Sequence, residues 1–143
     1  MGRLFAIDYG KKRVGIAVSD ELKMIANPLT TVETYKIFDY IAEYLKTNPV
    51  ESFVVGQPFD MHGNPSEATQ YIEPFVVKLG NLYPSIPIFR VDERFTSKLA
   101  FDAILTTVPK KSKRRDKSLV DKLSATIILE SFMDNPSFYM NKK

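Results

Sequence analysis

Two apolar runs near the start of the chain constrain its fold more than any other feature. "LFAID" (residues 4–8) and "VGIAVSD" (residues 14–20) are rich in apolar and β-branched residues, and only the segment "YGKKR" separates them. Two such runs around a short glycine-containing connection are typical of a β-hairpin. The sequence therefore predicts two antiparallel strands at the start of the fold, with Asp8 at the end of the first strand.

The chain then alternates between strands and helices. A third strand is expected near residues 25–33, a helix within residues 35–48 and a short buried strand at residues 51–58. A helix between two strands is typical of a covered parallel sheet, and right-handed crossovers would place the first and fourth strands side by side. The expected apolar stripe of this helix is formed by Ile37, Phe38, Ile41, Ala42 and Leu45.

The second half of the chain continues the same pattern. Asn64 is the expected N-cap of a second helix, and Pro74 inside that helix predicts a kink or a break. The remaining expected elements are a strand at 86–93, a short helix at 97–105 and a last helix at 118–134. The fold class is therefore α/β, with a mixed central sheet, antiparallel first strands and flanking helices. The length of 143 residues suits one domain over residues 1–143.

Composition excludes several kinds of chemistry. The chain has no cysteine, which rules out disulfides and thiolate ligands, and His62 is its one histidine. Any bound metal would therefore have oxygen ligands. No apolar stretch approaches the roughly 18 residues of a membrane span, and the start lacks the pattern of a secretory signal. We expect a cytoplasmic protein without a membrane partner.

Positive charge is concentrated in one segment. The run "KKSKRRDK" (residues 110–117) has six cations and one anion, more positive charge than the whole chain's net +3. Contact with a nucleic-acid backbone is expected here, although a solvated basic loop is the alternative. A second group of cations follows Gly10 in the hairpin connection, with the same two interpretations. The candidate nucleic-acid-binding residues are Lys11, Lys12, Arg13, Lys110, Lys111, Lys113, Arg114 and Arg115.

Three acidic positions are expected at one end of the sheet. Asp8 ends the first strand, Asp92 and Glu93 end the strand at 86–93, and Asp121 is expected in the first turn of the last helix. In α/β sheets, ligand sites lie at the carboxyl ends of the strands. The inward-facing helical stripe that Asp121 borders is formed by Ala125, Ile128 and Phe132.

Each of these carboxylates also has a simpler explanation. Asp121 could stabilise the helix dipole, Asp92 or Glu93 could form a surface ion pair with a neighbouring arginine, and Asp8 could serve the hairpin turn. Together, however, the carboxylates would repel one another unless cations hold them. An oxygen-only ligand set suits Mg²⁺ or Mn²⁺. Two such ions can activate water and stabilise the leaving oxygen of a phosphodiester, so no histidine base is required.

Four motifs along the chain resemble the YqgF/RuvX family of pre-16S rRNA nucleases and Holliday junction resolvases. They are "FAIDYGKKRVGIAVSD", "FVVGQPFDMHGNPSEA", "VDERFTSKLA" and "LVDKLSATIILESFM", and together they cover almost the whole chain. The resemblance implies a ribonuclease H-like fold and metal-dependent hydrolysis of phosphodiesters. It implies catalytic and metal-binding roles for Asp8, for Glu93 in the motif that also holds Asp92 and Arg94, and for Asp121. We favour Glu93 over Asp92, because adjacent strand residues point to opposite faces, and we add Arg94 to the nucleic-acid-binding residues.

The chain departs from the family pattern at the fourth strand. Where the family usually has Gly-Leu-Pro, this chain has Gly56-Gln57-Pro58, and Asp60 replaces an asparagine. Related resolvases have a carboxylate on the fourth strand, and this strand has none. Either Glu93 takes over the role of that carboxylate, or the metal site is weaker than in those resolvases.

The expected function is a Mg²⁺- or Mn²⁺-dependent nuclease that matures the 5′ end of pre-16S rRNA. The alternatives are a Holliday junction resolvase-like DNA endonuclease and a non-catalytic nucleic-acid-binding module. The first motif also resembles the phosphate loop of actin-like ATPases. Such ATPases need two related domains, and this chain has room for one. The expected partner is pre-rRNA or branched DNA, and the protein is expected to be a monomer or a homodimer.

Overall fold

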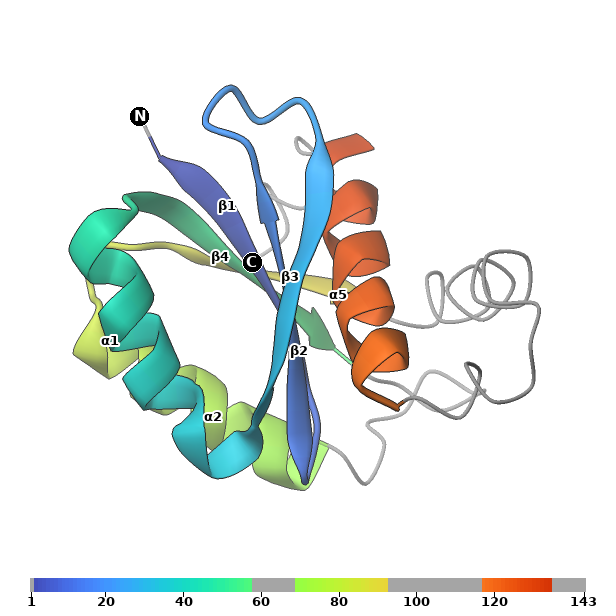
Figure 1. Ribbon diagram of the computed structural model, residues 1–143. Coiled ribbons are helices and arrows are strands. Elements are labelled where there is room, and N and C mark those ends of the chain that lie inside the picture. Colours follow the sequence, from blue (N-terminus) through green and yellow to red (C-terminus); the bar gives the residue numbers. More distant parts are fainter. Residues whose placement is uncertain (1, 58–68, 93–116, 135–143) are drawn as a thin grey trace.

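A five-stranded mixed sheet is the centre of the fold (Figure 1). The computed structural model describes residues 2–57, 69–92 and 117–134. Secondary structure in these ranges follows the apolar runs of the sequence closely. The strands are β1 (Arg3–Tyr9), β2 (Arg13–Ser19), β3 (Ala26–Glu33), β4 (Val50–Gln57) and β5 (Ile88–Asp92).

The strand order is β3-β2-β1-β4-β5. β1, β2 and β3 are antiparallel neighbours, which confirms the predicted hairpin and third strand. β4 is parallel to β1, and β5 is parallel to β4, as the predicted crossovers require. The carboxyl ends of β1, β4 and β5 therefore lie at the same edge of the sheet, where a ligand site is expected.

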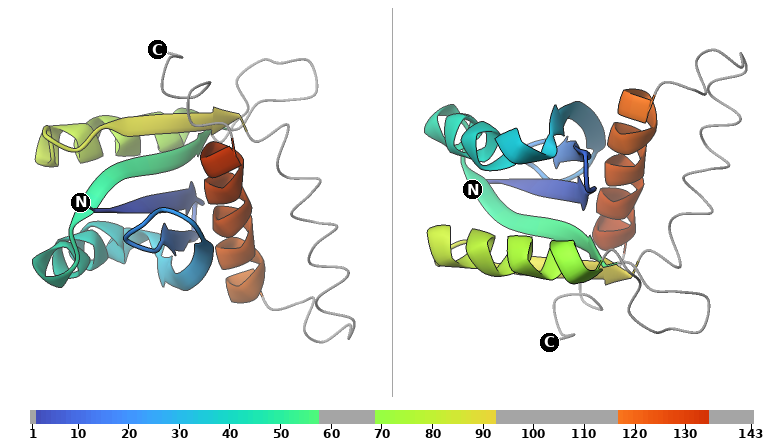
Figure 2. Two further views of the ribbon diagram at one scale, coloured as in Figure 1. Left: turned by 90° about the horizontal axis from the view of Figure 1, so that it is seen from above. Right: turned by 90° about the horizontal axis from the view of Figure 1, so that it is seen from below.

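Helices cover both faces of the sheet (Figure 2). The chain passes from β3 through a short 3-10 helix, η1 (Thr34–Lys36), into α1, and then through β4 into the segment that contains α2. α1 and α2 lie on one face, whereas α5 crosses the other face. The α-helices are α1 (Ile37–Thr47), α2 (Thr69–Leu82) and α5 (Lys117–Asp134).

The α1/α2 face buries the larger core. Phe5, with no exposed surface, makes edge-to-face contacts with Phe53 of β4 and Tyr44 of α1. Such aromatic pairs add about 0.5–1.5 kcal/mol each beyond the burial of their area. The other residues of this core include Ile7, Val14, Ile16, Val18, Ile37, Ile41, Val55, Ile72, Phe75 and Leu79.

The α5 face has a smaller core built from short side chains on the sheet. Ala6 and Ala17 are completely buried beneath α5, and their small size lets the helix approach the strands closely. The stacked rings of Phe89 and Phe132, with centroids 5.3 Å apart, close this core toward β5. Its other members are Leu4, Val54, Val91, Ala125, Ile128 and Leu129.

Two expectations about the helices, the burial of Ala42 and a break at Pro74, are wrong. Ala42 was expected on the buried stripe of α1 but is exposed. Tyr44, which was not expected on that stripe, packs against the core and contacts Phe5 of β1. α2 is continuous through Pro74 and does not break there. Pro74 is exposed, so the carbonyl group that loses its helical partner can be hydrated, while Ile72 and Phe75 hold the helix to the sheet.

The connection between β1 and β2 is tight and is held by the residue that follows β3. A Cβ atom on Gly10 would lie 2.5 Å from the carbonyl oxygen of Arg13, so only glycine fits without a shift. The Thr34 hydroxyl donates a hydrogen bond of 2.7 Å to the Gly10 carbonyl, and the Thr34 N–H donates one of 3.0 Å to the Lys12 carbonyl. The chain is therefore fixed in position immediately after Asp8 and Tyr9.

Candidate functional site

Asp8 lies near the carboxyl end of β1, the middle strand of the sheet, and its side chain is half-buried. Successive strand residues point to opposite faces, and Leu4 and Ala6 pack against α5. Asp8 has the same parity and therefore belongs to the α5 face. Tyr9, the next residue, belongs to the α1/α2 face and stacks on Phe75 with ring centroids 4.3 Å apart.

The strands on either side of Asp8 have glycines at its level. Asp8 is directly paired with Gly15 of β2. The ladder between β1 and β4 pairs Ile7 with Val55, so Gly56 is level with Asp8 on the other side. Neither neighbouring strand therefore places a Cβ atom beside the Asp8 carboxylate. On this face the next side chain outward is Val91 of β5, which is paired with Gly56 and completely buried.

α5 brings a second predicted residue to this end of the sheet. The helix runs from the end that holds the β1–β2 connection toward the end that holds the β2–β3 loop (Figure 1). Ala125 is completely buried in the same core as Ala6, and position 121 lies one helical turn before it. The predicted stripe is confirmed, because Ala125, Ile128 and Phe132 are buried. The helix begins at Lys117, however, which makes Asp121 its fifth residue and places it beyond the predicted first turn.

Several predicted site residues lie outside the described residues. Asp92 is the last residue of β5, and Glu93 and Arg94 follow it beyond the described range. The predicted helix start at Asn64, the predicted helix at 97–105 and residues 110–116 of the basic run also lie outside it. The basic residues concerned are Lys110, Lys111, Lys113, Arg114 and Arg115.

Arg90 has a partner that the sequence did not indicate. Its guanidinium donates two hydrogen bonds, of 2.9 and 2.8 Å, to the two carboxylate oxygens of Glu73 on α2. It also donates one of 3.3 Å to the carbonyl of Gly56, the residue level with Asp8. Arg90 thus connects α2 and β5 to the carboxyl end of β4. Its neighbours in sequence gave no signal of this, because Glu73 lies 17 residues away.

The three cations of the hairpin connection lie next to Asp8 in the chain. Lys11 and Lys12 are exposed, and Arg13 is half-buried at the start of β2. Tyr9, just before them, packs against Phe75 and Tyr71, and burial of its phenol raises its pKa, with a smaller contribution from Tyr71. The hairpin therefore presents positive charge to solvent beside a half-buried carboxylate.

Of the three candidate metal ligands, Asp8 is the one whose side chain the structure describes. In residues 2–57, 69–92 and 117–134, no group of three or more histidine, cysteine, aspartate or glutamate side chains is placed so that it could hold a metal ion. The Asp8 carboxylate, beside two residues without side chains and near the end of the central strand, fits as one oxygen ligand of a divalent cation.

Sequence reasoning missed a cleft beside the hairpin. It has a volume of about 640 Å³ and lies between the β1–β2 connection, η1, the start of α1 and α2. Its lining includes three lysines and three aromatic residues from these separate segments. A signal in the sequence was Tyr35, the first residue of the stretch 35–48 in which a helix is expected. The lining residues used below are Tyr9, Lys11, Lys12, Tyr35, Phe38 and Lys78.

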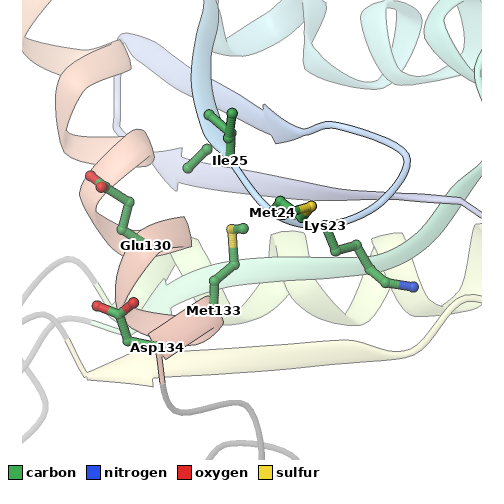
Figure 3. Close-up of a pocket in the computed structure, with 7 residues that line it drawn as sticks. Lys23, Met24, Ile25, Glu130, Met133 and Asp134 are labelled. Carbon is green, nitrogen blue, oxygen red and sulfur yellow. The ribbon is translucent and has the colours of Figure 1, made fainter.

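A second hollow of about 270 Å³ lies at the opposite end of the sheet, between the β2–β3 loop and the end of α5 (Figure 3). Met24, Ile25 and Met133 form its apolar part, and Glu130 and Asp134 lie on its helical side. Asp8, the candidate catalytic residue whose side chain the structure describes, does not line it. Among the described helices, none is long and apolar enough to cross a membrane.

The arrangement of strands and helices is that of RuvC, a ribonuclease H-like fold. The structure of Thermus thermophilus RuvC in complex with Holliday junction substrate matches with a TM-score of 0.57 at 17% identity, covering 94% of this chain and 96% of that chain. A second Thermus thermophilus RuvC structure matches with a TM-score of 0.53 at 16% identity, over 92% and 96% of the two chains. At these identities the likeness establishes the fold.

The sequence defines the family within this fold. Residues 2–135 match the family model described as "RuvX: Holliday junction resolvase", and the chain belongs to this family. A relative from Porphyromonas gingivalis is 54% identical, with 95% of this chain and 99% of the relative covered. Relatives from Phocaeicola vulgatus and Flavobacterium johnsoniae are 49% and 43% identical, with 96% of this chain and 99% and 100% of the relatives covered. All three bear the name "Putative pre-16S rRNA nuclease", so the predicted resemblance and the nuclease class are confirmed.

Proposed function

We propose that this chain is a divalent-metal-dependent nuclease that cleaves phosphodiester bonds of structured nucleic acid, with Asp8, Glu93 and Asp121 as its catalytic, metal-binding residues. The observation that carries the proposal is the position of Asp8. It is a half-buried carboxylate at the carboxyl end of the central strand, level with two glycines and on the face covered by α5. In α/β sheets this edge is the ordinary place for a ligand site.

Strand parity supports Glu93 over Asp92 as the second ligand. Phe89 and Val91 of β5 pack in the core of the α5 face, whereas Arg90 reaches Glu73 of α2. In an extended strand, position 93 has the parity of Val91 and therefore that of Asp8. Asp92 has the parity of Arg90. The third ligand, Asp121, precedes buried Ala125 by one turn of α5.

The metal, Mg²⁺ or Mn²⁺, would activate a water molecule and stabilise the charge that develops on the leaving oxygen. The carboxylates would hold the cation at the strand end and leave the hairpin side open to substrate. Lys11, Lys12 and Arg13 would offset the charge of the phosphate backbone. Arg94 and the basic residues of the run 110–117 would add contacts to phosphates away from the reacting bond. In this proposal residues 1–143 act as one cytoplasmic domain.

The names of the relatives support an RNA substrate. Because relatives at 43–54% identity over nearly the whole chain are named for pre-16S rRNA, we infer that 5′-end maturation of this precursor is the reaction. The description of the family model as a Holliday junction resolvase supports a branched DNA substrate as the second candidate. The chemistry proposed for Asp8 is the same in both. A non-catalytic binding module would need none of these carboxylates.

One experiment compares the candidates. The protein is incubated with pre-16S rRNA and with a four-way DNA junction, each in Mg²⁺, Mn²⁺ or EDTA. We expect cleavage of the RNA precursor with either metal and none in EDTA. Metal-dependent cleavage of the junction alone would favour the resolvase, and binding without cleavage of either substrate would contradict the proposed function.

A further inference from the structure

The cleft between the hairpin and α2 combines positive charge with aromatic surface. Lys11 and Lys12 contribute from the β1–β2 connection, and Lys78 contributes from α2, 66 positions after Lys12 in the printed sequence. All three lysines are exposed. Within the described residues, no carboxylate forms an ion pair with any of them, and the cleft's one acidic residue, Glu33, pairs with Lys36 at 3.7 Å. The cleft therefore offers three cations to an anionic ligand.

Tyr35 is the most exposed aromatic residue among the described large apolar side chains. It lies in η1 at the rim of the cleft, with 74% of its surface exposed. The neighbouring rings are arranged differently: Tyr9 stacks on Phe75, and Phe38 contacts Phe75 with centroids 5.3 Å apart. Since Tyr35 does not belong to this core, packing does not account for an aromatic residue at this position. An exposed ring beside cations is the usual platform for an unpaired base.

Two cations already lie over aromatic rings at this cleft. The Lys78 ammonium is 4.6 Å from the centroid of the Phe38 ring, and the Lys36 ammonium is 5.4 Å from that of Tyr35. Such contacts hold a flexible lysine over a ring and keep its charge close to the aromatic surface. At about 640 Å³ the cleft is within the usual range of ligand sites, about 300–1,000 Å³.

We propose that this cleft binds an unpaired stretch of the nucleic-acid substrate, with a base stacked on Tyr35 and phosphates beside Lys11, Lys12 and Lys78. A base within a duplex has both faces covered by its neighbours, so the aromatic rim selects a single-stranded segment. The inference rests on the proposed nuclease function, since it names the form of substrate next to the proposed metal site.

The position of the cleft explains how one strand could reach both places. Asp8 and Tyr9 are adjacent in β1 and belong to opposite faces of the sheet. The cleft is lined by Tyr9 and by the connection that follows it, so it begins where the proposed metal site ends. A strand cut near Asp8 would pass around the lysines of the hairpin to Tyr35. The enzyme would then require an unpaired flank beside the bond that it cuts.

Tyr35→Trp tests this placement directly, because the chain has no natural tryptophan. The full-length variant is titrated in EDTA with hexa-adenylate RNA, with the matching DNA and with a blunt RNA duplex. We expect saturable quenching of the tryptophan by both single strands and little by the duplex. Leu22→Trp is the matched control: Leu22 is 68% exposed in the β2–β3 loop, at the other end of the sheet, and should not respond.

The size of the effect is tested by Tyr35→Ala and Tyr35→Phe. Loss of one stacked base should weaken hexa-adenylate binding by about five- to a hundredfold, and phenylalanine should restore it. Lys78→Gln should lower the salt slope by about 0.7, whereas Lys46→Gln at the far end of α1 should not change it. Unchanged affinity in Tyr35→Ala, or equal quenching at positions 22 and 35, would overturn the inference. Either result is independent of cleavage, which is measured separately in Mg²⁺.

Discussion

Asp8 of β1 is directly paired with Gly15 of β2 in the antiparallel ladder of the hairpin. On its other side Asp8 is level with Gly56 of β4, which in turn is paired with Val91 of β5. A carboxylate thus occupies the middle of a row across the sheet in which both immediate neighbours lack side chains. The row ends at Val91 of β5, which faces α5 as Asp8 does. In an extended strand Glu93 would point to this same face and Asp92 to the opposite one.

The first prediction concerns that pair. Glu93→Gln should lower metal-dependent cleavage by at least two orders of magnitude, because it removes the charge on the face shared with Asp8. Asp92→Asn is the matched control on the neighbouring position and should keep most of the activity. Single-turnover cleavage of pre-16S rRNA measures both. The reverse ranking would show that the strand changes its parity after Val91.

The second prediction concerns the hairpin connection. Gly10→Ala should lower the free energy of unfolding by about 1–3 kcal/mol, since its Cβ would lie 2.5 Å from the Arg13 carbonyl oxygen and the backbone must move. Gly80→Ala in α2 is the control, because its Cβ would lie 3.7 Å from the nearest atom, the Cδ1 of Ile88. Alanine in place of glycine in a helix should raise the free energy of unfolding by about 0.5–1 kcal/mol. Urea denaturation measures both. Equal effects would argue against the tight connection.

The third prediction concerns the Arg90–Glu73 pair. Glu73→Gln should cost about 1–2 kcal/mol, because a bidentate pair is lost from an arginine that is only 19% exposed. Glu43→Gln breaks an exposed pair with Lys46 in α1 and should cost less than about 0.5 kcal/mol. Both values come from urea denaturation. A cost for Glu73→Gln no larger than that of its control would mean that the pair does not hold α2 to the sheet.

The fourth prediction concerns pH and the β2–β3 loop. The Asp20 carboxylate accepts hydrogen bonds from the N–H groups of Ile25 and Met24, at 2.8 and 2.7 Å, and the bond from Ile25 is the main cause of its lowered pKa. A carboxyl whose pKa is lower in the folded state stabilises the loop fully above its ordinary pKa, about 4, and loses this effect as the pH falls through the folded value.

Amide chemical shifts measure this loop directly. The signals of Met24 and Ile25 should move together as the pH falls below the ordinary carboxyl pKa of about 4, while the loop loses its two carboxylate contacts. The same transition should be absent in Asp20→Ala. Shifts that do not depend on pH in the natural protein would contradict the assigned hydrogen bonds.

Local sequence patterns predicted most of the sheet. The β-branched runs around "YGKKR" are sufficient for a hairpin, and the handedness of crossovers is sufficient to place β4 beside β1. The same runs predicted Asp8 at the carboxyl end of the first strand, and β1 ends one residue later, at Tyr9. These features depend on neighbours in sequence or on general chirality, so no long-range contact had to be known.

Features that depend on tertiary contacts were not predictable. Nothing near Arg90 indicates Glu73, because their pairing requires α2 to lie beside β5. Pro74 was expected to interrupt α2, but its neighbours Ile72 and Phe75 hold the helix in place. The cleft at Tyr35 joins three separate stretches of the chain and becomes visible only when they are assembled. The start of α5 at Lys117 likewise moves Asp121 out of the first turn.

The most direct test of the central claim is the metal-dependent cleavage of pre-16S rRNA by Asp8→Asn. Asparagine keeps the shape of the side chain but removes the charge that would hold Mg²⁺ or Mn²⁺, so cleavage should fall by orders of magnitude while thermal unfolding stays near that of the natural protein. Asp39→Asn, an exposed carboxylate of α1, is the control and should cleave normally. Cleavage by Asp8→Asn at the natural rate would contradict the assignment of the active site.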